Sequence, residues 1–355
     1  MSCAISLGDL LKSLDLACLL DLYHLHANNS CSEPDHVYIC PLVLVHPSKE
    51  VPMSVTFPEI RVGQPLRYQS LLVFPLFTES YGNIDYLLAD EAIKEKLLKV
   101  EEVSETGSVP DLLVENKGNT RVLFIEGEEL IGAKQNRILN TSILVAAKSK
   151  VKIPVSCVEQ GRWGYKSKFF GSSGFHSPSK LRYAMKASVT QSLKAKRGRR
   201  SDQGKVWEEV AALQDAHNVE SPTGAMSDTF AAYEDQITTY REKLKYVDGA
   251  SGMAIALGGK IVGCDLFDKP STCQKIWDRL LSGHFFGALE SNKSNKETNA
   301  ADIEELIKTT SHAGWEQAEP IGEGTEYRAE FDHGEHASAL TLDDSLVHGS
   351  VLTSV

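Results

Sequence analysis

Two short polar stretches carry the residues of this chain that are best suited to chemistry. The first, "EGEELIGAKQNR", spans residues 126–137 and sets three glutamates ahead of a cationic, amide-rich block. Lysine binds phosphate or carboxylate as a point charge, and arginine binds them through a bidentate fork. Amide side chains both donate and accept hydrogen bonds, which suits a base or a ribose. We therefore predict a ligand site, with the binding residues Lys134, Gln135, Asn136 and Arg137.

The glutamates of this stretch offer acid–base chemistry. Glu128 and Glu129 could orient the cations, bind a metal or act as a general base, and Glu128 is the predicted catalytic residue. The alternative is a surface turn held by local ion pairs. Because each exposed pair contributes only about 0–1 kcal/mol, such pairs explain little of the density of polar residues. We therefore favour a functional site.

The second stretch, "CVEQGRWGYKSKFF", spans residues 157–170. Glu159 lies among cations that should keep it ionised, so it could position Arg162 or take a proton from a substrate. Arg162 could stabilise charge that develops during a reaction, and both residues are predicted to be catalytic. Trp163 offers a face for stacking a base, although a core position fits the sequence equally well. Cys157 has no histidine near it in sequence, and we expect a buried thiol.

Charge is distributed unevenly along the chain. The formal net charge is −11, yet residues 134–205 contain seventeen Lys or Arg against two acids, which gives this segment +15 and the remainder −26. Such asymmetry indicates an anionic partner for the middle segment. The alternative is that the basic and acidic parts pair within the fold. The run "KAKRGRR" at residues 194–200 is typical of a solvated basic surface or a nuclear localisation signal.

The composition is that of a globular protein, with 42% hydrophobic and 24% charged residues among 355. No apolar run reaches the roughly 18–20 residues of a membrane span, so no membrane partner is expected. Seven scattered cysteines without a CxxC pair indicate a reducing compartment, and we predict a cytoplasmic location. No zinc-type spacing, P-loop, GxGxxG or GxSxG occurs. We predict no metal site, and the sequence does not identify a cofactor.

Residues 1–34 are predicted to form a separate amphipathic extension. Their leucines are interrupted by charged residues such as Asp9, Lys12 and Asp15, which the apolar centre of a signal peptide would not carry. We expect a helix that docks on the body of the protein or on a partner protein.

Strands are predicted from about residue 36 to 156, where short apolar or β-branched runs alternate with Gly, Pro and Asn. "VYICPLVLV" is the first of them. "RILNTSILVAA" predicts one strand, "LLADEAIKEKLLKV" one helix with Asp90 as its N-cap, and residues 161–180 a long polar and aromatic loop. Gly258-Gly259 predicts a hairpin turn, and residues 326–352 predict a C-terminal β-meander.

Helices are predicted in the middle of the chain. Apolar residues spaced by four and three over residues 226–248 predict one helix with a buried stripe. A second helix should begin near Pro270 and end at Gly283, before a polar linker at 289–300. The pattern as a whole predicts an α+β fold: a strand-rich mixed or antiparallel sheet core, a helical insertion at about 180–248 and the β-meander. Residues 35–353 form the predicted domain, with 35–160, 180–248 and 250–353 as candidate subdomains.

The blocks "EGEELIGAKQNRILNTSILV", "IPVSCVEQGRW", "QGKVWEEV" and "CDLF" resemble the ARG and Rhodanese-Phosphatase-superfamily-associated protein domain, ARPP-1. The resemblance covers about residues 35–353. Its most specific motif is Gly-Glu…Gly-x-Lys-Gln-Asn-Arg, within residues 127–137, and Ala133 stands where a second glycine is common. The family name records association with ADP-ribosyl glycohydrolases and rhodanese- or phosphatase-type domains. This association implies handling of ADP-ribose, nucleotides or damaged RNA.

Three hypotheses follow from these observations. The first is an enzyme acting on a nucleotide, an ADP-ribosyl group or an RNA end, with cations that hold phosphate and a glutamate as general acid or base. The second is a non-catalytic module that binds a phosphorylated nucleoside or RNA. The third is a structural adaptor that uses the N-terminal helix and the 226–248 stripe.

Overall fold

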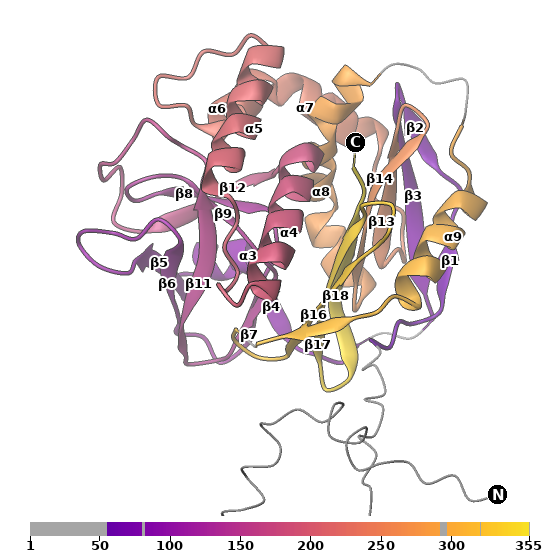
Figure 1. The fold of residues 1–355 in the computed structure, drawn as a ribbon, viewed down its shortest axis with the longest axis horizontal. Helices are drawn as coiled ribbons and strands as arrows, with labels where there is room; N and C mark the ends of the chain where they lie inside the picture. The colour runs from indigo at the N-terminus through magenta and orange to yellow at the C-terminus, as the bar shows by residue number, and fades with distance from the viewer. Residues whose placement is uncertain (1–54, 80–81, 292–296, 320, 355) are drawn as a thin grey trace, which may run out of the picture. The chain divides into compact units, whose positions relative to one another are not determined.

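The structure is a computed structural model that describes residues 55–79, 82–291, 297–319 and 321–354. The predicted extension at residues 1–34 and the predicted strand "VYICPLVLV" lie outside this part of the chain. Within the described residues, short apolar runs form three sheets, and helices separate two groups of strands (Figure 1). The predicted α+β fold is therefore confirmed.

The largest sheet combines the first and last strands of the described chain. Its strands are β1 (Ile60–Val62), β2 (Leu66–Tyr68), β3 (Leu71–Thr78), β13 (Gly252–Leu257), β14 (Lys260–Phe267), β15 (Glu316–Ala318), β16 (Thr325–Glu330), β17 (His336–Leu342) and β18 (Ser345–Leu352). They pair antiparallel in the order β1-β3-β13-β14-β18-β17-β16-β15, with β2 beside β3. Gly258-Gly259 and Asp343-Asp344 have positive φ angles at both positions, as two-residue hairpin turns require. The predicted hairpin and β-meander are confirmed.

A second sheet of six strands curls into a partly closed barrel. Its strands are β5 (Leu98–Glu102), β6 (Asp111–Asn116), β8 (Glu128–Gly132), β9 (Arg137–Leu139), β11 (Lys150–Cys157) and β12 (Phe170–His176). They pair in the order β12-β8-β9-β11-β6-β5, and the two edge strands, β12 and β5, contact each other. Alternate side chains from these strands, among them Val100, Leu112 and Leu130, fill the inside of the barrel.

A small mixed sheet closes the apolar core of the barrel. It contains β4 (Tyr86–Leu88), β7 (Arg121–Phe124) and β10 (Ile143–Val145) in the order β10-β7-β4. β4 and β7 are parallel, whereas every other strand pair in the described residues is antiparallel. Phe124 and Ile143 pack in the same cluster as the inner residues of the barrel.

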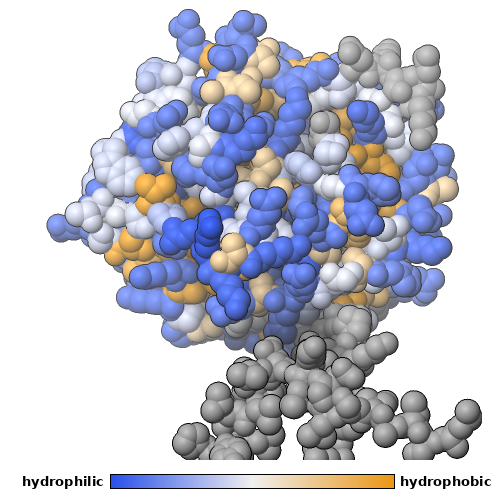
Figure 2. Space-filling view, viewed as in Figure 1, coloured by the Kyte–Doolittle hydropathy of each residue, from blue (hydrophilic) through white to orange (hydrophobic). Residues whose placement is uncertain are grey.

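The helices lie mainly between the barrel and the nine-stranded sheet. They are α3 (Ala89–Lys94), α4 (Ser179–Lys194), α5 (Gln203–Ala216), α6 (Met226–Ala232), α7 (Glu234–Lys243), α8 (Pro270–Glu290) and α9 (Ala300–Ser311). In Figure 1, α4 and α8 stand between the barrel strands on the left and the large sheet on the right. α4 to α7 correspond to the predicted helical insertion. In the described residues, no helix is long and apolar enough to cross a membrane, and the face shown in Figure 2 is mostly hydrophilic.

The predicted stripe at 226–248 is buried, but it lies on two helices. Met226, Phe230, Ile237 and Tyr240 belong to the core next to α8. The helix breaks at Tyr233, which ends α6 and precedes α7. In this position the Tyr233 hydroxyl donates to the carbonyl of His217, at 3.2 Å. The prediction of a single helix is wrong, and the prediction of a stripe buried on its own domain is confirmed.

The predicted strand "RILNTSILVAA" is divided into β9 and β10, which belong to different sheets. Residues 140–142, between the two strands, form side-chain hydrogen bonds with distant residues. Asn140 donates to the carbonyl of Arg199, Thr141 to the carboxylate of Glu326, and Ser142 is bonded to His348. Side-chain partners far away in sequence therefore interrupt a segment whose local propensity favours one strand.

Other predicted boundaries differ for identifiable reasons. α8 does not end at Gly283 but continues to Glu290. Gly283 instead permits close packing inside the helix, because a Cβ there would lie 2.5 Å from the carbonyl oxygen of Ser177. The predicted loop at 161–180 contains β12, and α3 ends at Lys94, with Leu88 rather than Asp90 as its N-cap. The sequence did not predict α9, whose N-cap is Asn299.

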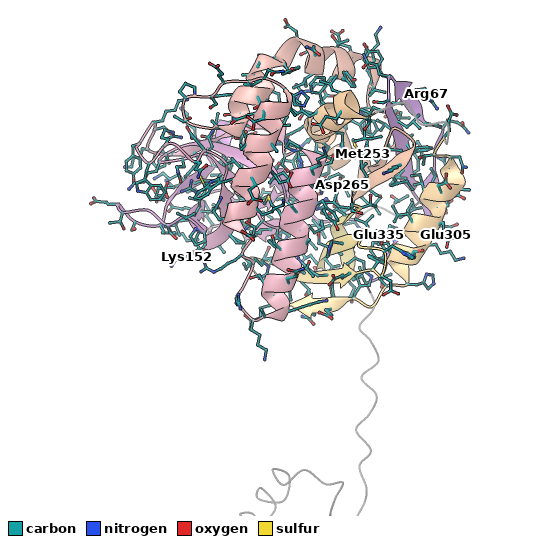
Figure 3. The ribbon with its side chains drawn as sticks, turned by 45° about the horizontal axis from the view of Figure 1, so that its top comes forward. Arg67, Lys152, Met253, Asp265, Glu305 and Glu335 are labelled. Atoms are coloured by element: carbon teal, nitrogen blue, oxygen red, sulfur yellow. The ribbon has the colours of Figure 1, made fainter. Side chains whose placement is uncertain are left out.

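A buried ionic network joins α4 to the two large sheets. The Arg182 guanidinium makes a bidentate pair with Asp265, at 2.7 and 2.5 Å (Asp265 is labelled in Figure 3). The Lys186 ammonium donates to Glu126 at 2.9 Å, and also to Ser338 and Ser350. Glu126 also pairs with Arg182, at 3.4 Å, so the two cations share two carboxylate partners, which offset their loss of hydration.

The shifts in pKa agree with this compensation. Burial by itself would raise the pKa of Glu126, but the charges of Lys186, Arg182 and Arg328 lower it to about 2. Burial lowers the pKa of Lys186 to about 8, against the opposing effect of Glu126. The first glutamate of "EGEEL" is thus an internal counter-ion and does not face solvent.

We predict that Lys186→Met alone destabilises the protein by about 3–5 kcal/mol, because it leaves buried Glu126 with less compensation. The double variant Lys186→Met/Glu126→Gln should recover a large part of this loss. Urea denaturation of the wild type, both single variants and the double variant forms a double-mutant cycle. Additive losses in the double variant would contradict the proposed coupling.

Candidate ligand-binding site

The two polar stretches meet at one end of the barrel. β8 ends at Gly132, where φ is +121°, and Ala133 continues the tight turn with a φ of +37°. The chain then returns as β9, which pairs with the end of β11 so that Arg137 lies opposite Cys157. The segment after Cys157 therefore passes beside the 132–136 turn. Positive φ at Ala133 gives a physical reason for glycine to be favoured at this position.

Glu159 and Arg162 form an internal clamp across this junction. The Arg162 guanidinium donates to both Glu159 oxygens, at 2.7 and 2.6 Å, and to the carbonyls of Ala133, Gly132 and Gly164. Glu159 also accepts from the Asn136 backbone and from Thr223. Burial opposes ionisation of Glu159, but the hydrogen bond from Arg162 lowers its pKa. With these donors engaged, the pair is suited to positioning the turn.

Arg137 contrasts with this compensated pair. Its side chain is 0% exposed, and it points into the barrel because it pairs with inward-facing Leu130. Nη1 donates to Gln135 at 3.0 Å and to the Asn136 carbonyl at 3.4 Å. Nε and Nη2 have no hydrogen-bond partner among the described residues. These two nitrogens form one edge of the guanidinium, the edge that binds a carboxylate or phosphate with two parallel hydrogen bonds.

Lys134 lies between this buried arginine and two exposed rings. Its side chain is largely buried, and its ammonium lies 5.3 Å from the ring centroid of Trp163 and 5.1 Å from that of Tyr165. The same Trp163 ring lies 5.7 Å from the Arg137 guanidinium. Trp163 is 48% exposed and Tyr165 55% exposed, so neither is a core residue. The two rings offer a stacking surface above the two cations.

Gln135 and Asn136 connect the parts of the site. The Gln135 amide donates to the Glu159 carbonyl at 3.0 Å while its oxygen accepts from Arg137. Asn136 donates to Ser227 and accepts from the Gly132 backbone. Both amides are engaged within the protein, so they hold Arg137 and the turn in place.

Glu102 joins the site from the far side of the barrel, and the sequence did not indicate it. One of its oxygens accepts from the Lys134 backbone at 3.3 Å, and the other has no hydrogen-bond partner in the described part of the chain. An open cleft of about 810 Å³ adjoins it, lined by Glu101, Glu102, Ser104, Glu105 and Tyr165–Lys168. Only curling of the sheet brings β5 next to the β8–β9 turn, so no spacing along the chain could have indicated this residue.

The predicted catalytic residue Glu128 lies apart from this group. Its partners are the Ile125 backbone and the Arg279 guanidinium, at 3.1 and 3.0 Å. It stands at the opposite end of β8 from Gly132, and four residues of strand span about 13 Å. Burial is the main cause that raises the pKa of Glu128 to about 6. The structure therefore brings Lys134, Arg137, Glu159 and Arg162 together without Glu128.

Glu129 points to the outer face of the barrel and is buried, with Ser173 and Asn136 as hydrogen-bonding neighbours. Successive strand residues alternate in direction, and its paired residue Ile138 belongs to the helical core and not to the barrel interior. Burial is the largest of the effects that raise the pKa of Glu129 to about 8. The neighbouring carboxylates of Glu159 and Asp228 add to the shift, and Ser173 and Asn136 oppose it.

The remaining candidate groups have structural partners. Cys157 is buried, and burial raises the pKa of its thiol, as expected for an unreactive cysteine. In the run "KAKRGRR", Arg199 is buried against Glu326, and Lys194 pairs with Glu330. Much of the basic segment is therefore neutralised within the fold. Among the described residues, no group of three or more His, Cys, Asp or Glu is arranged to hold a metal ion.

Comparison with protein families gives one match. The family model described as ARPP-1, ARG and Rhodanese-Phosphatase-superfamily-associated Protein domain, matches residues 59–352. No curated protein and no solved structure matches the chain. The matched range contains every residue of the site, including the predicted motif at 127–137.

We predict opposite effects on stability for the two arginines of the site. Arg162→Met should lower the free energy of unfolding by about 3–5 kcal/mol, because Glu159 then remains buried without its counter-ion. Arg137→Met removes an uncompensated buried charge and should leave stability unchanged or raise it. Urea denaturation in phosphate-free buffer measures both. Comparable destabilisation by the two variants would show that Arg137 has a structural role only.

We also predict a pH-dependent contribution from Glu129. Its pKa is about 8 in the folded protein and near 4.5 in the unfolded chain, so the folded state binds more protons between these values. Stability should therefore fall as pH rises from about 4.5 to 8. Glu129→Gln should flatten this dependence in urea denaturation at pH 5, 6.5 and 8. The exposed Glu305, labelled in Figure 3, provides the control Glu305→Gln, and equal slopes for both variants would contradict the prediction.

Proposed function

The chain belongs to the family of ARG and Rhodanese-Phosphatase-superfamily-associated protein domains, and we propose that it binds a phosphate-bearing ligand at the polar end of its barrel. Arg137 is the central phosphate ligand, and Lys134 provides a second cation. Trp163 and Tyr165 flank the entrance. The mouths of β-barrels are common positions for small-molecule sites, because a rigid wall surrounds them.

One observation carries this proposal: the buried guanidinium of Arg137 has an entire bidentate edge without a partner among the described residues. Removing a cation from water without compensation is unfavourable by several kcal/mol. Burial accordingly lowers the pKa of Arg137 from its ordinary value. A ligand phosphate would supply both the missing charge and two hydrogen bonds. Arg182 is paired with the carboxylates of Asp265 and Glu126, and Arg162 is paired with that of Glu159. Arg137 has no such ion pair among the described residues, and this contrast supports a ligand role for it.

The aromatic rings favour a nucleotide or another ligand with a planar group. Base stacking on an aromatic side chain contributes about 1–3 kcal/mol in nucleic-acid complexes. Trp163 lies within 6 Å of both cations and is exposed over about half of its surface. A phosphate on Arg137 and a base on Trp163 would be compatible with this short separation.

The geometry supports a binding role more strongly than a catalytic one. Glu159 and Arg162 are engaged with each other, and Glu128 is paired with Arg279 at the other end of β8. An enzyme would need another proton carrier, and Glu129, the remaining glutamate of the 126–137 stretch, lies on the outer face of the barrel, opposite to Arg137. The adaptor hypothesis is weakened because the 226–248 stripe is part of the core. Three expectations from the sequence stay predictions: binding of RNA, a cytoplasmic or nuclear location, and a partner of the N-terminal helix.

We predict that AMP, ADP-ribose or a short RNA binds with an affinity that depends on Arg137. Isothermal titration calorimetry of the full chain at two salt concentrations should show binding that Arg137→Gln weakens at least tenfold, which corresponds to about 1.4 kcal/mol. The matched control Arg200→Gln changes an exposed arginine of the basic run and should have little effect.

The same samples separate the hypotheses. Incubation followed by chromatography of the nucleotide tests turnover, and hydrolysis that Arg137→Gln abolishes would favour an enzyme. Binding that is equal in the wild type and in Arg137→Gln, or absent with all three ligands, would overturn the proposed phosphate site.

A further inference from the structure

Glu102 is an acidic residue within an otherwise cationic site. It pairs with inward-facing Leu112 in the β5–β6 ladder, so its side chain points into the barrel. A Cβ on Gly107 would lie 3.4 Å from the free Glu102 oxygen, 3.2 Å from Lys134 and 3.1 Å from the Trp163 ring. These three groups therefore lie close together, next to Gly107. The charge of Glu102 also acts on Arg137, whose pKa it raises against the stronger effect of burial.

The charges of the site nearly cancel. Lys134 and Arg137 contribute +2 and Glu102 contributes −1, while Glu159 and Arg162 neutralise each other. In the adjoining cleft, two lysines, Lys166 and Lys168, face two glutamates, Glu101 and Glu105. The site as a whole thus has a net charge of about +1, which is far less than the +15 of the surrounding segment of sequence.

We infer that the site, if it binds phosphate as proposed above, selects ligands with a single phosphate next to a hydroxyl group, and that Glu102 determines this selectivity. The ligand class is a nucleoside monophosphate or a sugar monophosphate. The phosphate occupies the free edge of Arg137, and a ribose hydroxyl donates to the free oxygen of Glu102. The base lies on the half-exposed ring of Trp163.

Electrostatics is the physical reason for this selectivity. A second phosphate that extended from Arg137 toward Glu102 would place another negative charge next to that carboxylate. Two like charges held close together in a partly buried site repel each other more strongly than they would in water. Lys134 is the other cation beside Glu102, and in the charge count Glu102 balances it, so it leaves no surplus positive charge for a second phosphate. A hydroxyl donor, in contrast, satisfies the second oxygen of Glu102, to which no group in the described part of the chain donates.

The test compares ligands that differ only in the number of phosphates. We would titrate the full chain with AMP, ADP, ATP and ribose 5-phosphate at constant ionic strength. Wild type should bind AMP at least as tightly as ATP, and ribose 5-phosphate should bind measurably. Glu102→Gln keeps the shape of the side chain and the acceptor for the Lys134 backbone, and should shift the ATP-to-AMP affinity ratio about tenfold toward ATP.

Glu105→Gln removes the same charge from the exposed part of the cleft and should shift this ratio much less. Tighter binding of ATP than of AMP by the wild type would overturn the inference, and so would an unchanged ratio in Glu102→Gln. If either result is found and Arg137→Gln still abolishes binding, the proposed phosphate site remains supported and only the selectivity for a single phosphate is overturned. Absence of Arg137-dependent binding with all four ligands would overturn both proposals. Thermal unfolding of each variant, compared with Glu105→Gln, identifies loss of folding as a cause of lost binding.

Discussion

The site depends on the ion pair between Arg162 and Glu159. This pair connects three segments: the 132–136 turn, the 157–166 segment and the residues that precede α6. Two of these belong to the barrel and the third to the helical insertion. Because the Arg162 guanidinium bonds to the carbonyls of Gly132 and Ala133, it holds the turn in a conformation that includes a positive φ at an alanine. The conformation of this turn then determines where Lys134 and Arg137 lie.

Buried charges have carboxylate partners in one region of this fold and lack them in another. In the network beneath α4, each cation has carboxylate partners, and the pKa values of Glu126 and Asp265 are lowered accordingly, against the effect of burial. At the barrel mouth, one guanidinium edge and one carboxylate oxygen have no hydrogen-bond partner in the described residues. Both kinds of group lose hydration on folding, but only the first kind is compensated inside the protein. This difference distinguishes a structural ionic core from a region suited to a charged ligand.

The three glutamates of "EGEEL" illustrate how strand geometry separates neighbours in sequence. Glu126 precedes β8 and reaches the network of α4, Glu128 turns toward Arg279, and Glu129 lies on the opposite face of the strand. Adjacent carboxylates therefore experience three environments, with pKa values of about 2, 6 and 8. A cluster that looks like a single acidic site in the sequence is not one in space, because side chains alternate along a strand.

Local patterns in the sequence determined much of the secondary structure and part of the site. Turn residues such as Gly258-Gly259 and Asp343-Asp344, and the spacing of apolar residues after Met226, act within a few positions, so strands, hairpins and the buried stripe could be predicted. The density of polar residues likewise indicated that 134–137 and 159–163 belong together. Only the tertiary structure decided that Glu102 joins them, that Glu128 does not, and that Arg137 rather than Arg162 has a free edge. Those outcomes depend on the curling of the barrel and on partners from distant segments such as Thr223 and Arg279, and contacts between distant segments leave no periodic signal in one sequence.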